Sequence, residues 1–254
     1  MAGQKLVAEI CVDSAHAAIA AEQGGAQRVE LCDSLIEGGT TPSAGMIALT
    51  RAHISIGLHV LIRPRRGDFL YSDLEFDIMK HDIEVAKKLG ADGVVLGILK
   101  ADGNIDTART GELMTLAYPL SITFHRAFDL TPDPFRALDD LLQLKADRLL
   151  TSGQQPTALA GAQLISELVK KANDRIIIMP GAGINEQNVQ QLITQTGAGE
   201  YHTSARSRTD GDMLFRRNDL FMASATPLSE YEHFAADAAK VSAIRAAAEA
   251  ALQP

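Results

Sequence analysis

Two short stretches near the N-terminus each place a cysteine two residues after a glutamate. The stretch "VAEICVDS" carries Glu9 and Cys11, and "RVELCDS" carries Glu30 and Cys32. The chain has no other cysteine. Because side chains alternate between the two faces of a strand, each pair would lie on one face. A carboxylate beside a thiol can take part in acid–base chemistry or bind a metal ion.

The two thiols would come close together if their strands are neighbours in level register, because neighbouring strands lie about 4.8 Å apart. Two thiolates suit a soft ion such as Cu(I). Zinc would need about four ligands, and His125 would then have to join from another strand. The alternative is that both cysteines are buried as small apolar side chains. The spacing alone leaves these readings open.

Eight short apolar runs, most of them flanked by Gly, Asp or Pro, predict the strands that position these residues. They span residues 6–12, 28–33, 57–64, 93–99, 121–128, 148–153, 175–183 and 200–206. Helical patterns separate the runs. In the segment 72–90, Leu74, Ile78, Ile83, Val85 and Leu89 recur near a helical period, and Ser72 with Glu75 has the spacing of a capping box.

Eight strands alternating with helices in 254 residues predict the α/β class and a (β/α)8 TIM-type barrel. A doubly wound open sheet is the alternative, but no G-x-G-x-x-G follows the first strand. We predict a single domain over residues 1–254. An irregular excursion is expected around 207–228, and an alanine-rich C-terminal helix over 229–252.

The charge balance excludes some functions. The chain carries 32 Asp and Glu against 24 Lys and Arg, a formal net charge of −8. Nucleic acids and anionic membranes need a basic surface, so we predict that the protein binds neither. The two cysteines are too few for a disulfide framework, and neither a signal-peptide pattern nor a long apolar stretch is present. These features predict a cytoplasmic protein.

Period two along the predicted strands sends several ionisable side chains into the barrel interior. They are Glu9, Glu30, His59, Arg63, His125, His202 and Arg206. Buried charges are costly unless they are paired. The deeper residues, Glu9, Glu30 and His59, could form a structural ion network. Those at strand ends favour a ligand site, because barrel enzymes build their sites there.

An anion site is predicted at the carboxyl ends of the strands. Loops after strands seven and eight of such barrels often bind phosphate through backbone N–H groups, and glycine lets the backbone approach an anion. Alternatively, the glycines only form a tight turn after the strand. The arginines in "RPRRGDF" could likewise be an exposed run of charges. The predicted anion-binding residues are Arg63, Arg65, Arg126, Gly181, Gly183, Ser204 and Arg206.

Several motifs in order along the chain resemble the CutC copper-homeostasis family: "VELCDSLIEGGTTPSAG", "IRPRRGDFLYSDLE", "TFHRAFD", "RLLTSG" and "HTSAR". The resemblance covers nearly the whole chain. It implies a (β/α)8-type barrel, a cytoplasmic location, a homo-oligomer such as a dimer or tetramer, and a copper-homeostasis role. It also implies that Cys11 and Cys32 bind Cu(I). No organic cofactor is predicted.

The same residues allow a second function. The chain could be a barrel enzyme of isomerase or lyase type that acts on a small phosphorylated or carboxylated metabolite. His125 would then be the general acid or base, with Glu9 or Glu30 as its partner. A third reading is a non-catalytic scaffold in which the interior charges only stabilise the barrel.

Overall fold

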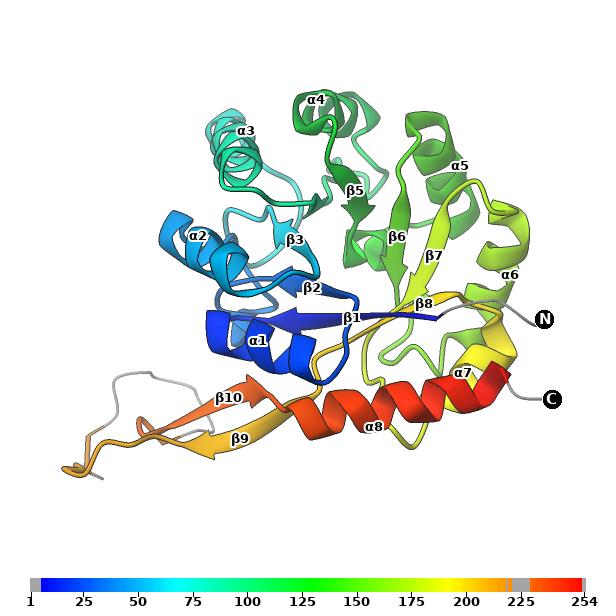
Figure 1. The fold of residues 1–254 in the computed structure, drawn as a ribbon. Coiled ribbons are helices and arrows are strands. Elements are labelled where there is room, and N and C mark those ends of the chain that lie inside the picture. Colours follow the sequence, from blue (N-terminus) through cyan, green and yellow to red (C-terminus); the bar gives the residue numbers. More distant parts are fainter. Residues whose placement is uncertain (1–5, 218, 221–228, 253–254) are drawn as a thin grey trace.

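Eight parallel strands form a nearly closed barrel, as the sequence predicts (Figure 1). The computed structural model describes residues 6–217, 219–220 and 229–252. The barrel strands are β1 Val7–Val12, β2 Arg28–Leu31, β3 Gly57–Leu61, β4 Gly93–Leu96, β5 Ser121–Phe124, β6 Arg148–Thr151, β7 Ile177–Pro180 and β8 Glu200–Thr203.

Neighbouring strands pair in chain order from β1 to β7, and β1 also pairs with β8. A single bridge between Gly181 and His202 joins β7 to β8 and closes the ring. This order follows from the repeated strand–helix unit, because each right-handed crossover places the next parallel strand beside the last.

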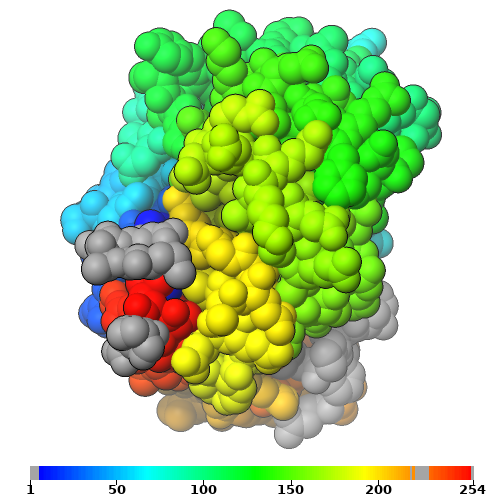
Figure 2. Space-filling model, turned by 90° about the vertical axis from the view of Figure 1, so that its right-hand side faces the viewer, coloured from blue at the N-terminus to red at the C-terminus, as the bar shows by residue number. Residues whose placement is uncertain are grey.

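Helices surround the barrel and bury the outward-facing apolar residues of the strands (Figure 1). They are α1 Ala15–Gln23, α2 Ala44–His53, α3 Asp73–Lys88, α4 Thr107–Ala117, α5 Pro134–Leu144, α6 Ala162–Ala172, α7 Val189–Thr196 and α8 Ala238–Glu249. Short 3-10 helices accompany them in the described part of the chain: η1 Leu35–Glu37, η2 Arg126–Leu130 and η3 Ala250–Leu252. In Figure 2, α7 in yellow lies at the surface between α6 and the red α8.

The predicted helix over 72–90 is confirmed, including its capping box. The Ser72 hydroxyl accepts a hydrogen bond from the Glu75 N–H, and the Glu75 carboxylate accepts one from the Ser72 N–H. The buried face differs in part from the predicted stripe. Phe76, Met79, Ile83 and Ala86 are buried, whereas Leu74, Ile78 and Val85 are exposed.

The C-terminal region departs from the expected excursion and helix. Residues Arg206–Asp210 form β9, which pairs antiparallel with β10, Glu232–Ala236, in a hairpin that projects from the barrel (Figure 1). The helix predicted from residue 229 therefore begins only at Ala238, after an Asp237 cap. Residues 218 and 221–228 of the expected excursion lie outside the described residues. No helix in the described part of the chain is long and apolar enough to cross a membrane.

Candidate functional site

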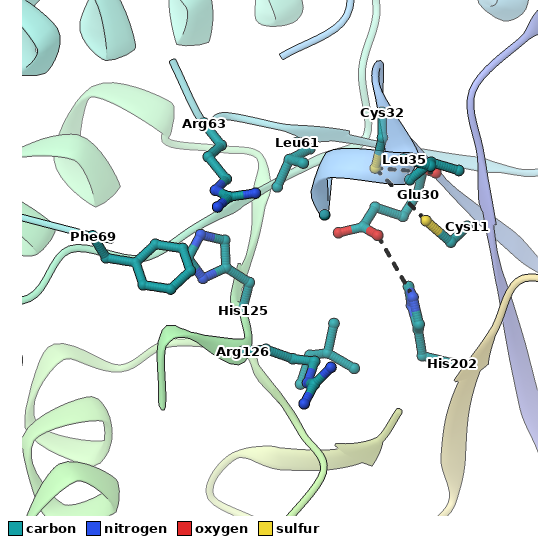
Figure 3. A pocket seen from close by; sticks show the side chains of 12 residues that line it. Cys11, Glu30, Cys32, Leu35, Leu61, Arg63, Phe69, His125, Arg126 and His202 are labelled. Atoms are coloured by element: carbon teal, nitrogen blue, oxygen red, sulfur yellow. Dashed lines mark hydrogen bonds and ion pairs between the residues drawn. The ribbon is translucent and has the colours of Figure 1, made fainter. Parts of the chain in front are cut away.

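A cavity of about 140 Å³ lies at the carboxyl ends of the strands. Most of its lining residues form two opposing groups (Figure 3). We call Cys11, Glu30, Cys32 and His202 the thiol wall, and Arg63, Phe69, His125 and Arg126 the cationic wall. Leucine side chains complete the lining, including Leu61 and Leu150. The carboxyl end of the strands is where barrel enzymes place their sites.

The two cysteines meet in the thiol wall, although the register is not level, since Cys11 of β1 lies opposite Glu30 of β2 and Cys32 follows two residues later. Their sulfur atoms lie 3.7 Å apart, and both thiols are buried and free. One ligand atom from each of Cys11, Glu30 and Cys32 falls within 4.8 Å of the others. This group could therefore hold a metal ion.

His202 links the thiol wall to the barrel interior. Its Nδ1 lies 2.8 Å from Glu9 Oε1, and its Nε2 lies 3.6 Å from Glu30 Oε2. Burial disfavours a charged imidazole, but contacts with Cys11 and with the glutamates raise the pKa of His202 well above its usual value. Burial, with the nearby charge of Cys11, raises the pKa of Glu30 well above its usual value.

The two thiols have opposite electrostatic environments. The hydrogen bond with Cys32, helped by His202, holds the pKa of Cys11 well below that of an ordinary thiol. Burial raises the pKa of Cys32, and the neighbouring Cys11 adds to this rise. Cys11 is thus the thiol of the pair that loses its proton more readily.

The cationic wall contains two buried N–H donors without an acceptor. Arg63 and His125 are 7% and 6% exposed. Neither Arg63 Nε nor His125 Nε2 has a hydrogen-bond partner among the described residues. Burial, with the nearby charge of Arg63, lowers the pKa of His125 to about 3, so the ring is neutral.

Arg126, the exposed member of the cationic wall, is already paired. Its Nε lies 2.8 Å from Asp129 Oδ2, and its Nη2 donates to the Ser152 hydroxyl at 3.0 Å. Its charge is therefore largely balanced by Asp129.

The other predicted anion-binding residues do not converge on the cavity. Arg65 points to the surface, where it pairs with Glu75 and Asp68. Ser204 and Arg206 line a separate outer pocket beside Lys240 of α8. Gly181 lies close to Leu150 and His202, where a side chain would clash. Gly183 takes a positive φ of 70° in the turn after β7.

The glutamates predicted as partners of His125 have other partners, and Glu30 lies near His202 in the thiol wall. Glu9 is fully buried and pairs with Arg28 and His202, not with His125. No carboxylate within the described residues forms an ion pair with His125. The predicted contact of His125 with Glu9 or Glu30 is therefore not present among the described residues.

An ion network does lie below the cavity around Glu9, but the sequence analysis missed its other members, Arg28, Arg148 and Glu200. Arg28 joins Glu9 to Glu200, with its Nη2 2.5 Å from Glu200 Oε2, and Arg148 Nε lies 2.6 Å from the same oxygen. His59 lies beside this network, with Nδ1 3.9 Å from Glu9 Oε2. Period two could have revealed it, because Arg28 shares a face with Glu30 and Glu200 shares one with His202.

The sulfur positions fit a bent, not a linear, pair of ligands. At a metal–sulfur distance of about 2.3 Å, as for zinc, a linear arrangement would need sulfurs about 4.6 Å apart. The separation here is 3.7 Å. A bent pair leaves room for a third ligand, and Glu30 is the third member of the group.

Comparisons with known proteins agree with the motifs and the fold. A family model described as the CutC family matches residues 6–207. A CutC family protein from Chromobacterium violaceum is 49% identical over 96% of this chain and 99% of its own length. The Mus musculus copper homeostasis protein cutC homolog is 47% identical over 98% of this chain and 91% of its own.

A solved structure extends this agreement to three dimensions. The CutC structure from Streptococcus agalactiae is 36% identical, with a TM-score of 0.75 over 78% of this chain and 98% of its own. The family model, these identities and the shared barrel lead to one conclusion: the chain belongs to the CutC family.

Proposed function

We propose that this protein binds Cu(I) through Cys11 and Cys32 and that this binding serves copper homeostasis. The observation that carries the proposal is the pair of free, buried sulfurs 3.7 Å apart. Relatives at this level of identity are named copper homeostasis proteins. Soft thiolate ligands select Cu(I) over harder ions.

The chemistry of the wall supports this choice of ion. Cys11 is poised as a thiolate, and a thiolate is the form that binds a metal. Zinc usually takes four protein ligands at structural sites, whereas the group found in the described residues offers three. The proposal includes a reducing, cytoplasmic setting, since such a setting keeps both thiols free.

Anaerobic titration with Cu(I) against a chromophoric Cu(I) chelator tests the proposal. We expect one strongly bound Cu(I) per chain in the wild type. A Cys11→Ser, Cys32→Ser double variant is thiol-free, because the chain has only two cysteines. It should lose the site. A double variant that competes with the chelator as well as the wild type does would contradict the proposal.

Glu30→Gln tests the third ligand separately. This substitution keeps the shape of the side chain and removes its charge. If Glu30 contributes a ligand oxygen, Cu(I) affinity should fall while the stoichiometry stays the same. Unchanged affinity would limit the site to the two sulfurs.

A second candidate function is a barrel enzyme that acts on a small anionic metabolite. The observation that favours it is the pair of unpartnered donors in the cationic wall, which Cu(I) binding does not use. His125 would act as the general acid through its Nε2–H. Proton exchange in D2O, followed by NMR on a panel of small acids, tests this function. Exchange that is absent, or equally fast with His125→Gln, would count against it.

A further inference from the structure

We infer that Arg63 and His125 bind the carboxylate of a small monoanionic acid, with the acid's carbon chain in the cavity between the two walls. This binding site deepens the second candidate function and requires neither Cu(I) nor turnover. Its support comes from the unmet hydrogen-bonding capacity, the charge and the volume of the cavity.

Arg63 is a buried cation without an anion. Its Nη1 donates to Gly39 O at 2.8 Å and its Nη2 to Gly67 O at 3.0 Å. These contacts fix the guanidinium but are made to neutral carbonyls. No carboxylate among the described residues forms an ion pair with it, and its Nε has no hydrogen-bond partner. A buried charge without a counter-ion is costly, so a bound anion would relieve that cost.

His125 presents a second unmet donor, and its tautomer is fixed by its other nitrogen. Nδ1 accepts a hydrogen bond from the Ala127 N–H at 3.2 Å. A neutral ring that accepts at Nδ1 must carry its proton on Nε2. Nε2 is buried and has no partner in the described part of the chain. Gly97 leaves room for the ring, because a Cβ there would lie 2.5 Å from His125 Cε1.

The two donors share one location. Both groups contact the Phe69 ring, with the Arg63 guanidinium carbon 5.1 Å and the His125 ring 4.8 Å from its centroid. Figure 3 shows a ring nitrogen of His125 facing the Arg63 guanidinium. Two donors that face each other cannot satisfy each other. They need an acceptor between them, and a carboxylate has acceptors only.

Charge and size narrow the ligand class. Arg126 is offset by Asp129, so the cationic wall has one uncompensated positive charge, which suits a monoanion better than a phosphate dianion. A cavity of about 150 Å³ accommodates benzene, and this cavity is about 140 Å³. The ligand therefore has on the order of six non-hydrogen atoms. Monocarboxylic acids of two or three carbons, including 2-hydroxy and 2-oxo acids, meet both conditions.

The test is calorimetric titration of copper-free, reduced full-length protein with acetate, lactate and pyruvate at constant ionic strength. Acetamide serves as the uncharged match for acetate, and phosphate as the dianion. We expect saturable binding of at least one carboxylate in the millimolar range, with none of acetamide. Losing a hydrogen bond to a charged group costs roughly tenfold or more in affinity, so Arg63→Gln and His125→Phe should each bind roughly tenfold more weakly.

Two further variants keep the result interpretable. Arg65→Gln removes a neighbouring arginine that is committed to Glu75 and Asp68, so it should bind like the wild type. His125→Gln keeps an N–H donor and should retain more affinity than His125→Phe. If Arg63→Gln fails to fold, the two His125 variants decide the matter.

Several results would overturn the inference. They are the absence of saturable carboxylate binding in the wild type, equal binding of acetamide, tighter binding of phosphate, and an Arg65→Gln variant as impaired as Arg63→Gln. Because no copper is present, none of these results bears on the Cu(I) proposal, and loss of Cu(I) binding in the cysteine variants leaves this inference intact.

Discussion

At the residue scale, the thiol wall combines a cysteine of lowered pKa with a nearby cysteine of raised pKa. The sulfurs of Cys11 and Cys32 lie 3.7 Å apart, and a disulfide requires about 2.05 Å. Small side-chain rotations could bring them together. Since thiolate is the nucleophile in disulfide formation, the low pKa of Cys11 favours the reaction.

We therefore predict that mild oxidation of the copper-free protein forms an intramolecular Cys11–Cys32 disulfide. Alkylation followed by mass spectrometry of the intact chain would show the loss of both reactive thiols, and a reductant should restore them. Bound Cu(I) should protect the pair. Oxidised protein that still alkylates at both cysteines would contradict the prediction.

His59 gives a second prediction at this scale, concerning pH. Burial, partly offset by Glu9, lowers the pKa of His59 to about 4. In the unfolded chain it would be about 6.5. Between these values the unfolded state binds a proton that the folded state does not, so stability falls as pH falls. Between pH 7 and pH 5, the proton uptake of this residue lowers the free energy of unfolding by about 2 kcal/mol.

His59→Gln should reduce this loss, measured as the difference in the free energy of unfolding between pH 7 and pH 5. Both proteins would be unfolded with urea at each pH. His202 titrates in the opposite sense, because its pKa is raised and its stabilising charge is lost as pH rises. That contribution is common to both proteins and cancels in the comparison. Identical pH dependence in the two proteins would refute the assignment.

The sequence could predict the inward faces of strands but not where the chain turns away from the barrel. Alternation correctly brought Cys11, Glu30 and Cys32 to one place, because period two holds wherever the ladder continues. Beyond Thr203, however, Ala205 takes a positive φ of 44° and the chain turns into β9. Arg206 therefore leaves the barrel and lies over Phe234 instead. No spacing rule in the sequence predicts such a turn.

At the element scale, inward glycines make room for the histidine rings. A Cβ on Gly93 of β4 would lie 2.5 Å from His59 Nε2, as a Cβ on Gly97 would from the His125 ring. Each glycine thus sits beside the histidine of a neighbouring strand. The sequence shows these glycines, but their role depends on strand register, which only the structure supplies.

We predict that Gly93→Ala destabilises the protein by about 1–3 kcal/mol, because the ring must move within a packed interior. Gly45→Ala is the matched control. Gly45 lies in α2, its Cβ would meet only Ser43 Oγ at 3.9 Å, and alanine is the better helix former. It should be neutral or slightly stabilising. Denaturant unfolding of both variants checks the contrast, and equal effects would contradict it.

At the scale of the whole molecule, alternation of eight strands with helices was enough to predict the barrel. The sequence did not show how the barrel closes, because β7 and β8 meet through a single bridge. An ion network across the barrel interior strengthens the junction between β7 and β8. Arg28 from β2 and Arg148 from β6 both bind Glu200 of β8, and Arg28 also binds Glu9 of β1. Four strands on both sides of the weak junction are thus connected by charge.

Breaking this network should destabilise the whole barrel and not one strand. Arg28→Met preserves the apolar stem but leaves Glu9 and Glu200 with a missing partner. Removing one member of a buried ion pair costs about 3–5 kcal/mol. Arg245→Met removes an arginine from a helical surface pair with Glu249 and should cost at most about 0.5 kcal/mol.

Urea unfolding gives both free energies, and hydrogen exchange locates the effect. If the network fastens the ring, Arg28→Met should speed amide exchange in β8 and β1 together, because both strands lose a contact to the same guanidinium. Arg245→Met should leave exchange in the strands unchanged. A small effect of Arg28→Met, or faster exchange confined to β2, would mean that the apolar packing of strands against helices closes the barrel without the charges.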